Sequence, residues 1–219
     1  MKISNRLKRV ASYVEDNSFV LDIGCDHGLL AIFLQQTKTN IKIIASDINL
    51  KPLNQARENI KLYQAKNIIL KQANGMDAYE EGIDTVILSG LGTSTILDIL
   101  LTDKDKLKEV NKIIIASNND YYKLRKTMND NGFYILDESV ILEKNKFYPI
   151  IVFIKGHKKY NYMQLKYGPI LLKTNDETMK KFILYSLNKL LEINKQLPKT
   201  QIIKIIKNLI EIKALRKML

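Results

Sequence analysis

Five short apolar runs, separated by stretches with helical signals, constrain the first 155 residues more than any other feature of this chain. The runs are apolar at nearly every position, a pattern typical of strands that are covered on both faces. Strands that alternate with helices at this spacing predict βαβ units and a mostly parallel, doubly wound α/β sheet. The predicted strands cover residues 19–23, 41–47, 68–73, 85–89 and 112–116.

Helix signals fill the gaps between these strands. Capping residues, a proline in a first turn and a closing glycine mark the expected ends. The expected helices run from Leu29 onward, from a cap at Asn49 to about Tyr63, over residues 96–101 with a cap at Thr93 or Ser94, and from near Tyr121 to a stop at Gly132.

The alternation ends after the fifth strand. Residues 134–140 and 150–154 have strand character, no helix separates them, and the polar residues 143–146 join them. The sheet is therefore expected to finish with an antiparallel hairpin at one edge. Five parallel strands followed by a terminal hairpin is the order of the Rossmann-like class I S-adenosylmethionine-dependent methyltransferase fold, whereas dinucleotide-binding folds usually continue with parallel strands.

Two further helical stretches follow, at about residues 178–196 and 199–218, with Pro198 between them. Each carries apolar residues at helical spacing, which predicts a coiled-coil-like helical hairpin held by an apolar seam. We therefore expect two domains, residues 1–156 and 157–219. The predicted seam residues are Ile183, Leu187 and Leu190 on the first helix and Ile202, Ile206 and Leu209 on the second.

Charge separates the same two regions. Residues 1–155 carry 21 basic and 19 acidic side chains, whereas residues 156–219 carry 14 basic and 4 acidic ones, within a net charge of +12. A basic module on a near-neutral body predicts a polyanionic partner such as RNA. The alternative is that the lysines form a solvated face of a helix pair.

The first strand opens into a loop that carries two glycines. Its residues run Asp22-Ile23-Gly24-Cys25-Asp26-His27-Gly28. A dinucleotide fingerprint would need glycine at position 26, where this chain has Asp26. A carboxylate would repel a pyrophosphate but suits a bound sulfonium cation. The loop therefore favours S-adenosylmethionine, with an ordinary βα turn as the alternative.

The ends of the next strands supply further candidates. Asp47 ends the second strand, where a carboxylate can accept hydrogen bonds from both hydroxyls of a ribose, or can simply cap the next helix. Asn74 or Asp77 could contact the edge of an adenine ring with Met76 on its face, or could form a polar turn over a buried methionine. The glycines of Gly90-Leu91-Gly92 leave backbone room beside a methyl donor.

Taken together, these motifs resemble those of the bacterial tRNA (adenine(22)-N(1))-methyltransferase family, TrmK. The resemblance covers essentially the whole chain, and it implies that Asp22, Gly24, Asp47, Asn74 and Gly90 line a pocket for S-adenosylmethionine and that Asp26 is important for catalysis. The motifs that carry it are Arg6-Leu7, the loop of residues 22–28, Asn74-Gly75, Gly90-Leu91-Gly92, Tyr148 and the terminal helical hairpin.

The methyl transfer that the resemblance implies suggests a role for each of these residues. Adenine N1 has an in-plane lone pair and can attack a sulfonium methyl without first losing a proton; a carboxylate, for which Asp26 is the candidate, would stabilise the positive charge that develops on the ring. Alternatively, Asp26 only caps a helix. We expect donor contacts from Asp22, Gly24, Cys25, His27, Gly28, Asp47, Ile48, Asn74, Gly75, Met76, Gly90 and Leu91. We expect RNA contacts from Arg6, Arg9, Asn118, Tyr148, Lys180, Lys181, Lys204 and Lys207.

Composition limits the remaining possibilities. Cys25 is the single cysteine and there are two histidines, so neither an intramolecular disulfide nor a Cys/His zinc site is expected. The chain has no apolar run of membrane-spanning length and no signal-peptide core at its start, which predicts a cytoplasmic protein. No obligate protein partner is expected. The competing functions are a methyltransferase for another RNA site or a small molecule, and a catalytically idle RNA-binding module.

Overall fold

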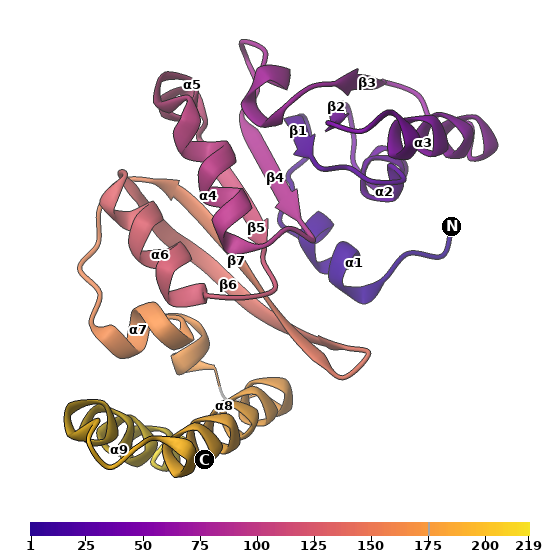
Figure 1. Cartoon of the computed structure of the whole chain (residues 1–219). Coiled ribbons are helices and arrows are strands. Elements are labelled where there is room, and N and C mark those ends of the chain that lie inside the picture. Colours follow the sequence, from indigo (N-terminus) through magenta and orange to yellow (C-terminus); the bar gives the residue numbers. More distant parts are fainter. Residues whose placement is uncertain (175) are drawn as a thin grey trace. The chain divides into compact units, whose positions relative to one another are not determined.

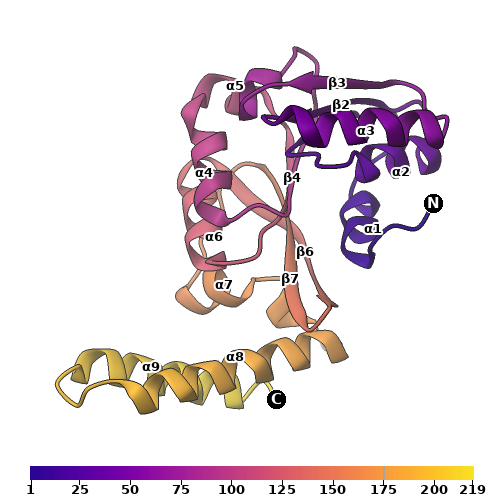
Figure 2. The same cartoon turned by 45° about the vertical axis from the view of Figure 1, so that its right-hand side comes forward.

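The computed structural model describes residues 1–174 and 176–219. It divides into two compact units, Met1–Ile170 and Leu171–Leu219. The first unit is a seven-stranded sheet with helices on both faces, and the second is a helical hairpin (Figures 1 and 2). The boundary between the two units lies after Ile170, whereas the sequence predicted a boundary after residue 156. Residues 157–170 therefore belong to the first unit.

The sheet has the order β3-β2-β1-β4-β5-β7-β6. Its first five strands are parallel, as predicted, and the chain reverses its direction of progress across the sheet between β1 and β4. In such folds the carboxyl ends of the strands at this reversal form the ligand crevice. The parallel strands are β1 (Phe19–Ile23), β2 (Lys42–Asp47), β3 (Ile68–Gln72), β4 (Thr85–Ser89) and β5 (Lys112–Ala116).

The predicted terminal hairpin is present and longer than expected. It comprises β6 (Phe133–Glu143) and β7 (Lys146–Lys155), and β7 pairs antiparallel with β5. Lys144 and Asn145 form the connection with φ of 47° and 61°. Two positive φ values in a two-residue turn match the right-handed twist of the flanking strands, which explains why both strands continue up to the turn.

Helices cover both faces of the sheet, so the core lies in two layers. α1, α2 and α3 contribute Val10, Leu30 and Leu53 to one apolar cluster, whereas α4, α5 and α6 contribute Leu97, Leu107 and Leu124 to the other. The helices are α1 (Asn5–Ser12), α2 (Leu29–Thr37), α3 (Leu50–Leu62), α4 (Thr93–Thr102), α5 (Lys104–Glu109) and α6 (Tyr121–Asp130), with a short 3-10 turn η1 (Gly75–Ala78) after β3.

The start of α4 differs from the prediction. Its N-cap is Gly92, and neither Thr93 nor Ser94 caps it. The side-chain oxygen Oδ1 of Asn119 accepts a hydrogen bond from the Thr93 amide at 2.9 Å. Because a side chain from a distant loop satisfies this first amide, the helix needs no capping side chain of its own.

A buried ion pair holds the end of the first unit. The Arg125 Nε donates to Glu138 Oε1 at 2.6 Å, and both side chains are at most 1% exposed. The Arg125 Nη1 also donates to the carbonyl oxygens of residues 165 and 166, in α7 (Tyr162–Tyr167), and Glu138 Oε2 accepts from the Ile170 amide. We call Arg125 and Glu138 the α7 clamp.

The second unit consists of η2 (Leu171–Lys173), α8 (Glu177–Gln196) and α9 (Ile202–Arg216). The predicted seam is confirmed on α8, where Ile183, Leu187 and Leu190 are buried. It is wrong on α9, where Ile202, Ile206 and Leu209 are 61%, 51% and 51% exposed. The buried positions of α9 are instead Asn208, Glu211, Ile212 and Leu215.

A polar contact lies on the face of α9 that turns inward. The Asn208 Nδ2 donates to Asn194 Oδ1 of α8 at 3.2 Å. α9 carries isoleucine or leucine on several faces, so its apolar pattern alone does not select one. Within the residues described, no helix is both long enough and apolar enough to cross a membrane.

Candidate active site

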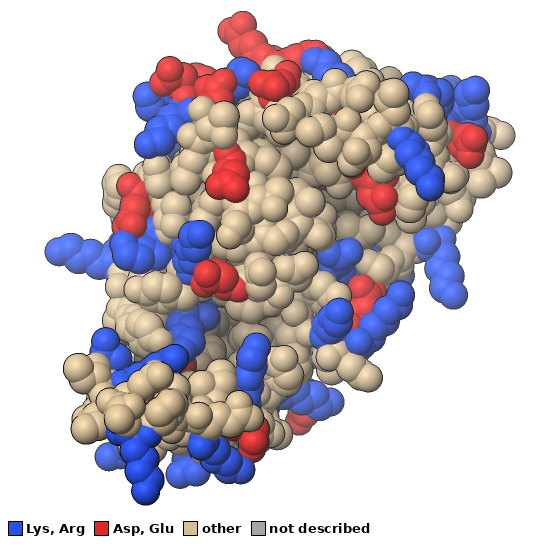
Figure 3. All heavy atoms as spheres, viewed as in Figure 1, with Lys and Arg blue, Asp and Glu red and all other residues tan. Residues whose placement is uncertain are grey.

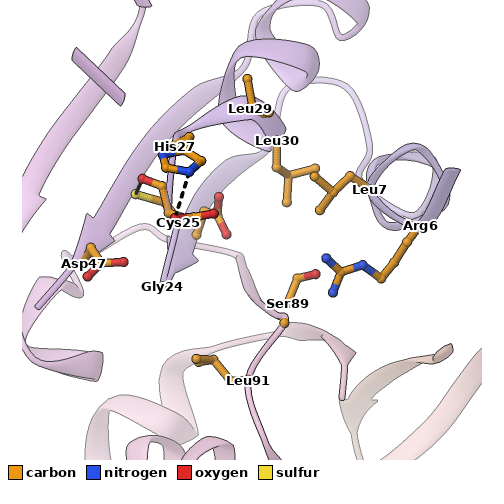
Figure 4. Close-up of a pocket in the computed structure, with 13 residues that line it drawn as sticks. Arg6, Leu7, Gly24, Cys25, His27, Leu29, Leu30, Asp47, Ser89 and Leu91 are labelled. Carbon is orange, nitrogen blue, oxygen red and sulfur yellow. Dashed lines mark hydrogen bonds and ion pairs between the residues drawn. The ribbon is translucent and has the colours of Figure 1, made fainter. Parts of the chain in front are cut away.

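A cavity of about 370 Å³ opens at the carboxyl ends of β1, β2 and β4, where the strand order reverses. Figure 4 shows the side chains that surround it. The sheet therefore brings together residues that are far apart in the sequence. The predicted residues that line the cavity are Arg6, Asp22, Gly24, Cys25, Asp26, His27, Asp47, Gly90 and Leu91.

Four lining residues were not predicted: Leu7, Leu29, Leu30 and Ser89. Leu7 lies on α1, a short polar helix that reaches the cavity only through the tertiary fold. Leu29 and Leu30 begin α2 directly after the glycine loop, and Ser89 directly precedes Gly90. The position of Ser89 at the end of a predicted strand was the signal that could have identified it.

Backbone geometry requires the two glycines of the loop. Gly24 has a φ of 73°, and a Cβ there would lie 3.3 Å from Leu91 Cδ1. Gly28 has a φ of 68°, and a Cβ there would lie 3.0 Å from the Cβ of Ala56. The amides of Gly24 and Cys25 both donate to the Ser46 carbonyl at 2.9 Å. The loop is thus fixed to β2 and leaves its cavity side open.

Asp22 is a buried carboxylate on the wall of this cavity. It is 3% exposed, and burial first, with the charge of Asp47 second, raises its pKa to about 7. A cationic ligand placed beside this side chain would favour its ionised form. Asp22 is therefore suited to a positively charged ligand.

Asp47 stands at the end of β2, on the far side of the loop from α1 (Figure 4). Its Oδ1 accepts a hydrogen bond from the Asn49 amide at 2.9 Å, while α3 has no side-chain cap. The carboxylate is thus oriented by the following turn without serving as a helix cap. This placement suits hydrogen bonds from ligand hydroxyls.

Asp26 projects from the loop with a left-handed φ of 52° and a side chain that is 70% exposed. His27 Nε2 lies 3.5 Å from Asp26 Oδ1. The N-cap of α2 is Gly28, without a side-chain cap hydrogen bond, so Asp26 does not cap that helix. A strained, accessible carboxylate at the rim of a cavity suits contact with a second ligand.

The single cysteine is unsuited to nucleophilic chemistry. Cys25 is 7% exposed, and burial, with further contributions from nearby aspartates, raises the pKa of its thiol far above the ordinary value. The thiol is therefore protonated at neutral pH, and a thiolate nucleophile is disfavoured. Among the described residues, no cluster of His, Cys, Asp and Glu is arranged to hold a metal ion.

The remaining predicted contacts lie outside the cavity wall. Ile48, Asn74 and Asn118 are exposed, and Met76 is buried in the core. Gly28 and Gly75 have left-handed backbones, Gly28 at the end of the loop and Gly75 in η1. The Arg9 side chain forms hydrogen bonds within the first unit, where it donates to Ser139 Oγ and to the Tyr13 hydroxyl. Tyr148, on β7, lies under the Arg6 guanidinium, 5.0 Å from ring centroid to Cζ. Lys180, Lys181, Lys204 and Lys207 are exposed on α8 and α9.

The fold and the cavity are those of a methyltransferase domain. The family model described as "Methyltransferase domain" matches residues 3–151. The tRNA (adenine(22)-N(1))-methyltransferase of Bacillus subtilis is 27% identical over 164 residues, which cover 74% of this chain and 69% of that one. The chain belongs to the methyltransferase domain family and, within it, to the TrmK family of tRNA (adenine(22)-N(1))-methyltransferases.

Solved structures match over the full length. A protein of the NADB-Rossmann superfamily from Streptococcus agalactiae is 32% identical with a TM-score of 0.90, and the match covers 100% of this chain and 97% of that one. The TrmK of M. capricolum, in complex with S-adenosylhomocysteine, is 29% identical with a TM-score of 0.84, covering 99% and 97%. The likeness therefore includes the terminal helical hairpin as well as the sheet.

Proposed function

We propose that this protein transfers the methyl group of S-adenosylmethionine to N1 of an adenine in tRNA, at position 22. The observation that carries the proposal is the cavity at the ends of β1, β2 and β4, with Asp22 and Asp47 on its wall and Asp26 at its rim. A TrmK with the cofactor product bound matches this chain over nearly its whole length, which supports the same donor and substrate.

The residues present fit S-adenosylmethionine. The positive φ of Gly24 and the contact that a Cβ there would make with Leu91 show a loop built without side-chain bulk beside the cavity. Asp47 is placed to accept from ribose hydroxyls, and Asp22 to face a cation. When bound, S-adenosylmethionine supplies an electrophilic methyl group on a positively charged sulfur.

The protein's own contribution is alignment and electrostatics. Asp26 is the candidate for the acceptor side, because its carboxylate can accept a hydrogen bond from the exocyclic amine of adenine. Its negative charge also stabilises the positive charge that develops on the ring as N1 is methylated. Since N1 attacks through a lone pair, no general base is required before methyl transfer. Holding the two reactants in line supplies most of the remaining acceleration.

The hairpin unit is proposed to hold the RNA. Residues 171–219 carry eleven basic and four acidic side chains, and Lys and Arg side chains surround α8 and α9 (lower part of Figure 3). Phosphate contacts of this kind give affinity with little sequence dependence. The target base must then be unpaired or flipped to expose N1. A tRNA substrate also supports a cytoplasmic location for the enzyme.

The first experiment tests donor, substrate, atom and residue together. The protein is incubated with methyl-labelled S-adenosylmethionine and unmodified tRNA, and the RNA is digested to nucleosides. We expect 1-methyladenosine from tRNA with adenine at position 22 and none when that base is guanine. Asp26→Ala should lower the turnover about 100-fold or more while S-adenosylhomocysteine binding is retained.

Asp98→Ala, which removes an exposed carboxylate from α4, is the matched control and should leave turnover unchanged. Near-normal turnover of Asp26→Ala would overturn the role of that residue. Donor binding without methyl transfer to any tRNA would overturn the substrate and redirect the search to small acceptors. Salt-sensitive tRNA binding without donor binding would identify an idle RNA-binding module.

A further inference from the structure

The end of the β6–β7 hairpin projects from the sheet at the edge where the cavity opens. The pairing of β7 with β5 ends at Ile151, opposite Ile115, whereas β6 and β7 stay paired up to Glu143 and Lys146. Residues 139–150 therefore extend past the carboxyl end of β5, by roughly 13 Å. We call residues 139–150 the β-arm, and Figures 1 and 2 show it projecting past the other strands.

We propose that the β-arm is an RNA-binding surface of the larger unit, on which Lys144 and Lys146 contact phosphates that flank the target nucleotide. This role rests on the proposed function, and it adds a second set of RNA contacts to those of the hairpin unit. The β-arm would hold the tRNA beside the cavity, where the adenine must enter.

The tip of the β-arm carries cations that no carboxylate neutralises. Lys144 and Lys146 are exposed, and so is Lys8 on α1. Within the described part of the chain none of these three lysines forms an ion pair, whereas Lys112, at the opposite end of β5, pairs with Glu15. Figure 3 shows Lys and Arg side chains gathered where the β-arm and α1 lie. A projecting tip with unneutralised cations fits the phosphates of a nucleic acid.

The turn at the tip favours a function for Lys144. Lys144 and Asn145 both have left-handed backbones, with φ of 47° and 61°. Two-residue turns of this kind prefer asparagine or aspartate followed by glycine, since most side chains are strained at positive φ. A lysine at the first position therefore weakens the turn, and a contact with an anion gives a reason for its presence there.

The β-arm is held beside the cavity by α1. The Arg9 Nε donates to Ser139 Oγ at 3.0 Å, and the Arg6 guanidinium, which lines the cavity, lies over the Tyr148 ring. Lys146 precedes Tyr148 by two residues, so it lies on the same face of β7 at a distance of roughly 7 Å along the strand. RNA that places a base in the cavity therefore passes close to the tip of the β-arm.

The first test replaces both lysines of the tip. Lys144→Gln/Lys146→Gln removes two charges and leaves polar side chains on the surface. The affinity for tRNA, measured by filter binding, should fall about 3- to 10-fold, and the slope of log affinity against log salt should become shallower by roughly two. In the methylation assay the KM for tRNA should rise by a similar factor, while kcat and the affinity for S-adenosylhomocysteine stay unchanged.

The matched control is Lys61→Gln/Lys66→Gln, which removes the same charge from the opposite edge of the sheet. Lys61 lies at the end of α3 and Lys66 lies before β3, and both are exposed. An effect of net charge alone would appear in both double variants. We expect the control to bind tRNA as the wild-type protein does, with the same salt slope.

Cross-linking locates the contact directly. Cys25 is the single native cysteine; it is buried, and burial raises the pKa of its thiol, so a cysteine introduced on the surface is labelled selectively. Leu142→Cys places a photoreactive label on the β-arm, and Leu62→Cys places one at the end of α3 as the control; both leucines are exposed. The label on the β-arm should form cross-links to nucleotides near the methylated adenine, and the control label should form none there.

Several outcomes would overturn the proposed role of the β-arm. These are an unchanged tRNA affinity in the tip variant, equal weakening in the control, a loss of kcat without a loss of affinity, and cross-links from the control label alone. If the wild-type protein binds tRNA but methylates none, the proposed function fails, and the affinities and cross-links still decide the role of the β-arm. If the wild-type protein binds no tRNA, both fail.

Discussion

At the scale of single residues, the site includes one carboxyl group that water reaches poorly. This group is Asp22, and burial together with the nearby Asp47 raises its pKa to about 7. In the ligand-free protein this carboxyl group is therefore close to half protonated at neutral pH. Donor binding and the protonation of Asp22 must then be linked, since a cationic ligand favours the ionised form.

We predict that the affinity for S-adenosylmethionine rises with pH up to about 7 and levels off above it. Below pH 7 a proton must leave Asp22 for the cation to bind, so affinity should fall by up to about tenfold per pH unit. Calorimetry from about pH 5.5 to 8.5, in buffers of different ionisation enthalpy, measures both the affinity and the proton released. Asp22→Asn should bind more weakly and lose this step; a step that persists in Asp22→Asn would assign it to another group.

At the scale of helices and strands, the α7 clamp ties the end of the first unit to α6 and β6. Arg125 and Glu138 are buried together and also bind backbone groups of residues 165, 166 and 170. Removing one charge of such a pair leaves the other buried without compensation. The loss of stability should therefore exceed that from any exposed ion pair on the same helix.

We predict that Glu138→Gln lowers the free energy of unfolding by about 3–5 kcal/mol. Urea denaturation measures the change, and hydrogen exchange should show faster exchange in residues 162–170. Asp130→Asn breaks the exposed pair of Lys126 and Asp130 on α6 and should change stability by less than about 0.5 kcal/mol. Equal effects of the two substitutions would contradict the role of the clamp.

The helices and strands also show how much of the fold could be predicted from the sequence. The parallel strands were predicted to within one residue at each end because they are short apolar runs with polar ends. β1, β2, β4 and β5 are buried along most of their length, whereas the edge strand β3 is only partly buried. α1 and α5 were missed because helices of eight and six residues are too short to establish a helical period along the sequence. The inward face of α9 was predicted wrongly because isoleucine and leucine occur on several faces of this helix, so apolar periodicity does not select one of them.

Some residues of the candidate site could likewise be predicted from the sequence, and others could not. Asp22, Gly24, Asp26 and Asp47 were predicted because strand ends and glycine loops have fixed places in a doubly wound sheet. The place of Arg6 in the cavity depends on how α1 packs and on the space beside Gly90, and neither is visible along the chain.

At the scale of the whole molecule, the charge is divided unevenly between the two units. Residues 1–170 carry 24 basic and 19 acidic side chains, whereas residues 171–219 carry eleven and four. In the proposed function, the larger unit presents an acidic cavity to a cationic donor, and the smaller unit is the one proposed to attract the RNA. Separating these two tasks avoids a conflict between the charges that each one requires.

We predict that replacing Lys180, Lys181, Lys204 and Lys207 by glutamine weakens tRNA binding and makes its salt dependence shallower. The slope of log affinity against log salt should change by roughly one for each phosphate that the protein no longer binds. Filter binding between about 50 and 200 mM salt measures this slope, because affinities for nucleic acid change steeply over that range. Donor affinity should stay unchanged.

The matched control replaces four exposed lysines of the larger unit, Lys42, Lys61, Lys66 and Lys104, and so removes the same total charge. Similar weakening in both variants would show that net charge alone attracts the RNA. Weakening confined to the hairpin variant would locate the phosphate contacts on α8 and α9.

The α7 clamp has a consequence for how this sequence can change over time. Its polar contacts with the segment that ends the larger unit go to backbone groups, two carbonyls and one amide. Substitutions at positions 165, 166 and 170 therefore leave the hydrogen bonds of the clamp in place. Gly168 is the exception, because a Cβ there would lie 2.5 Å from Glu138 Oε2. In a set of related sequences, we expect Arg125, Glu138 and Gly168 to be retained together while the neighbouring side chains diverge.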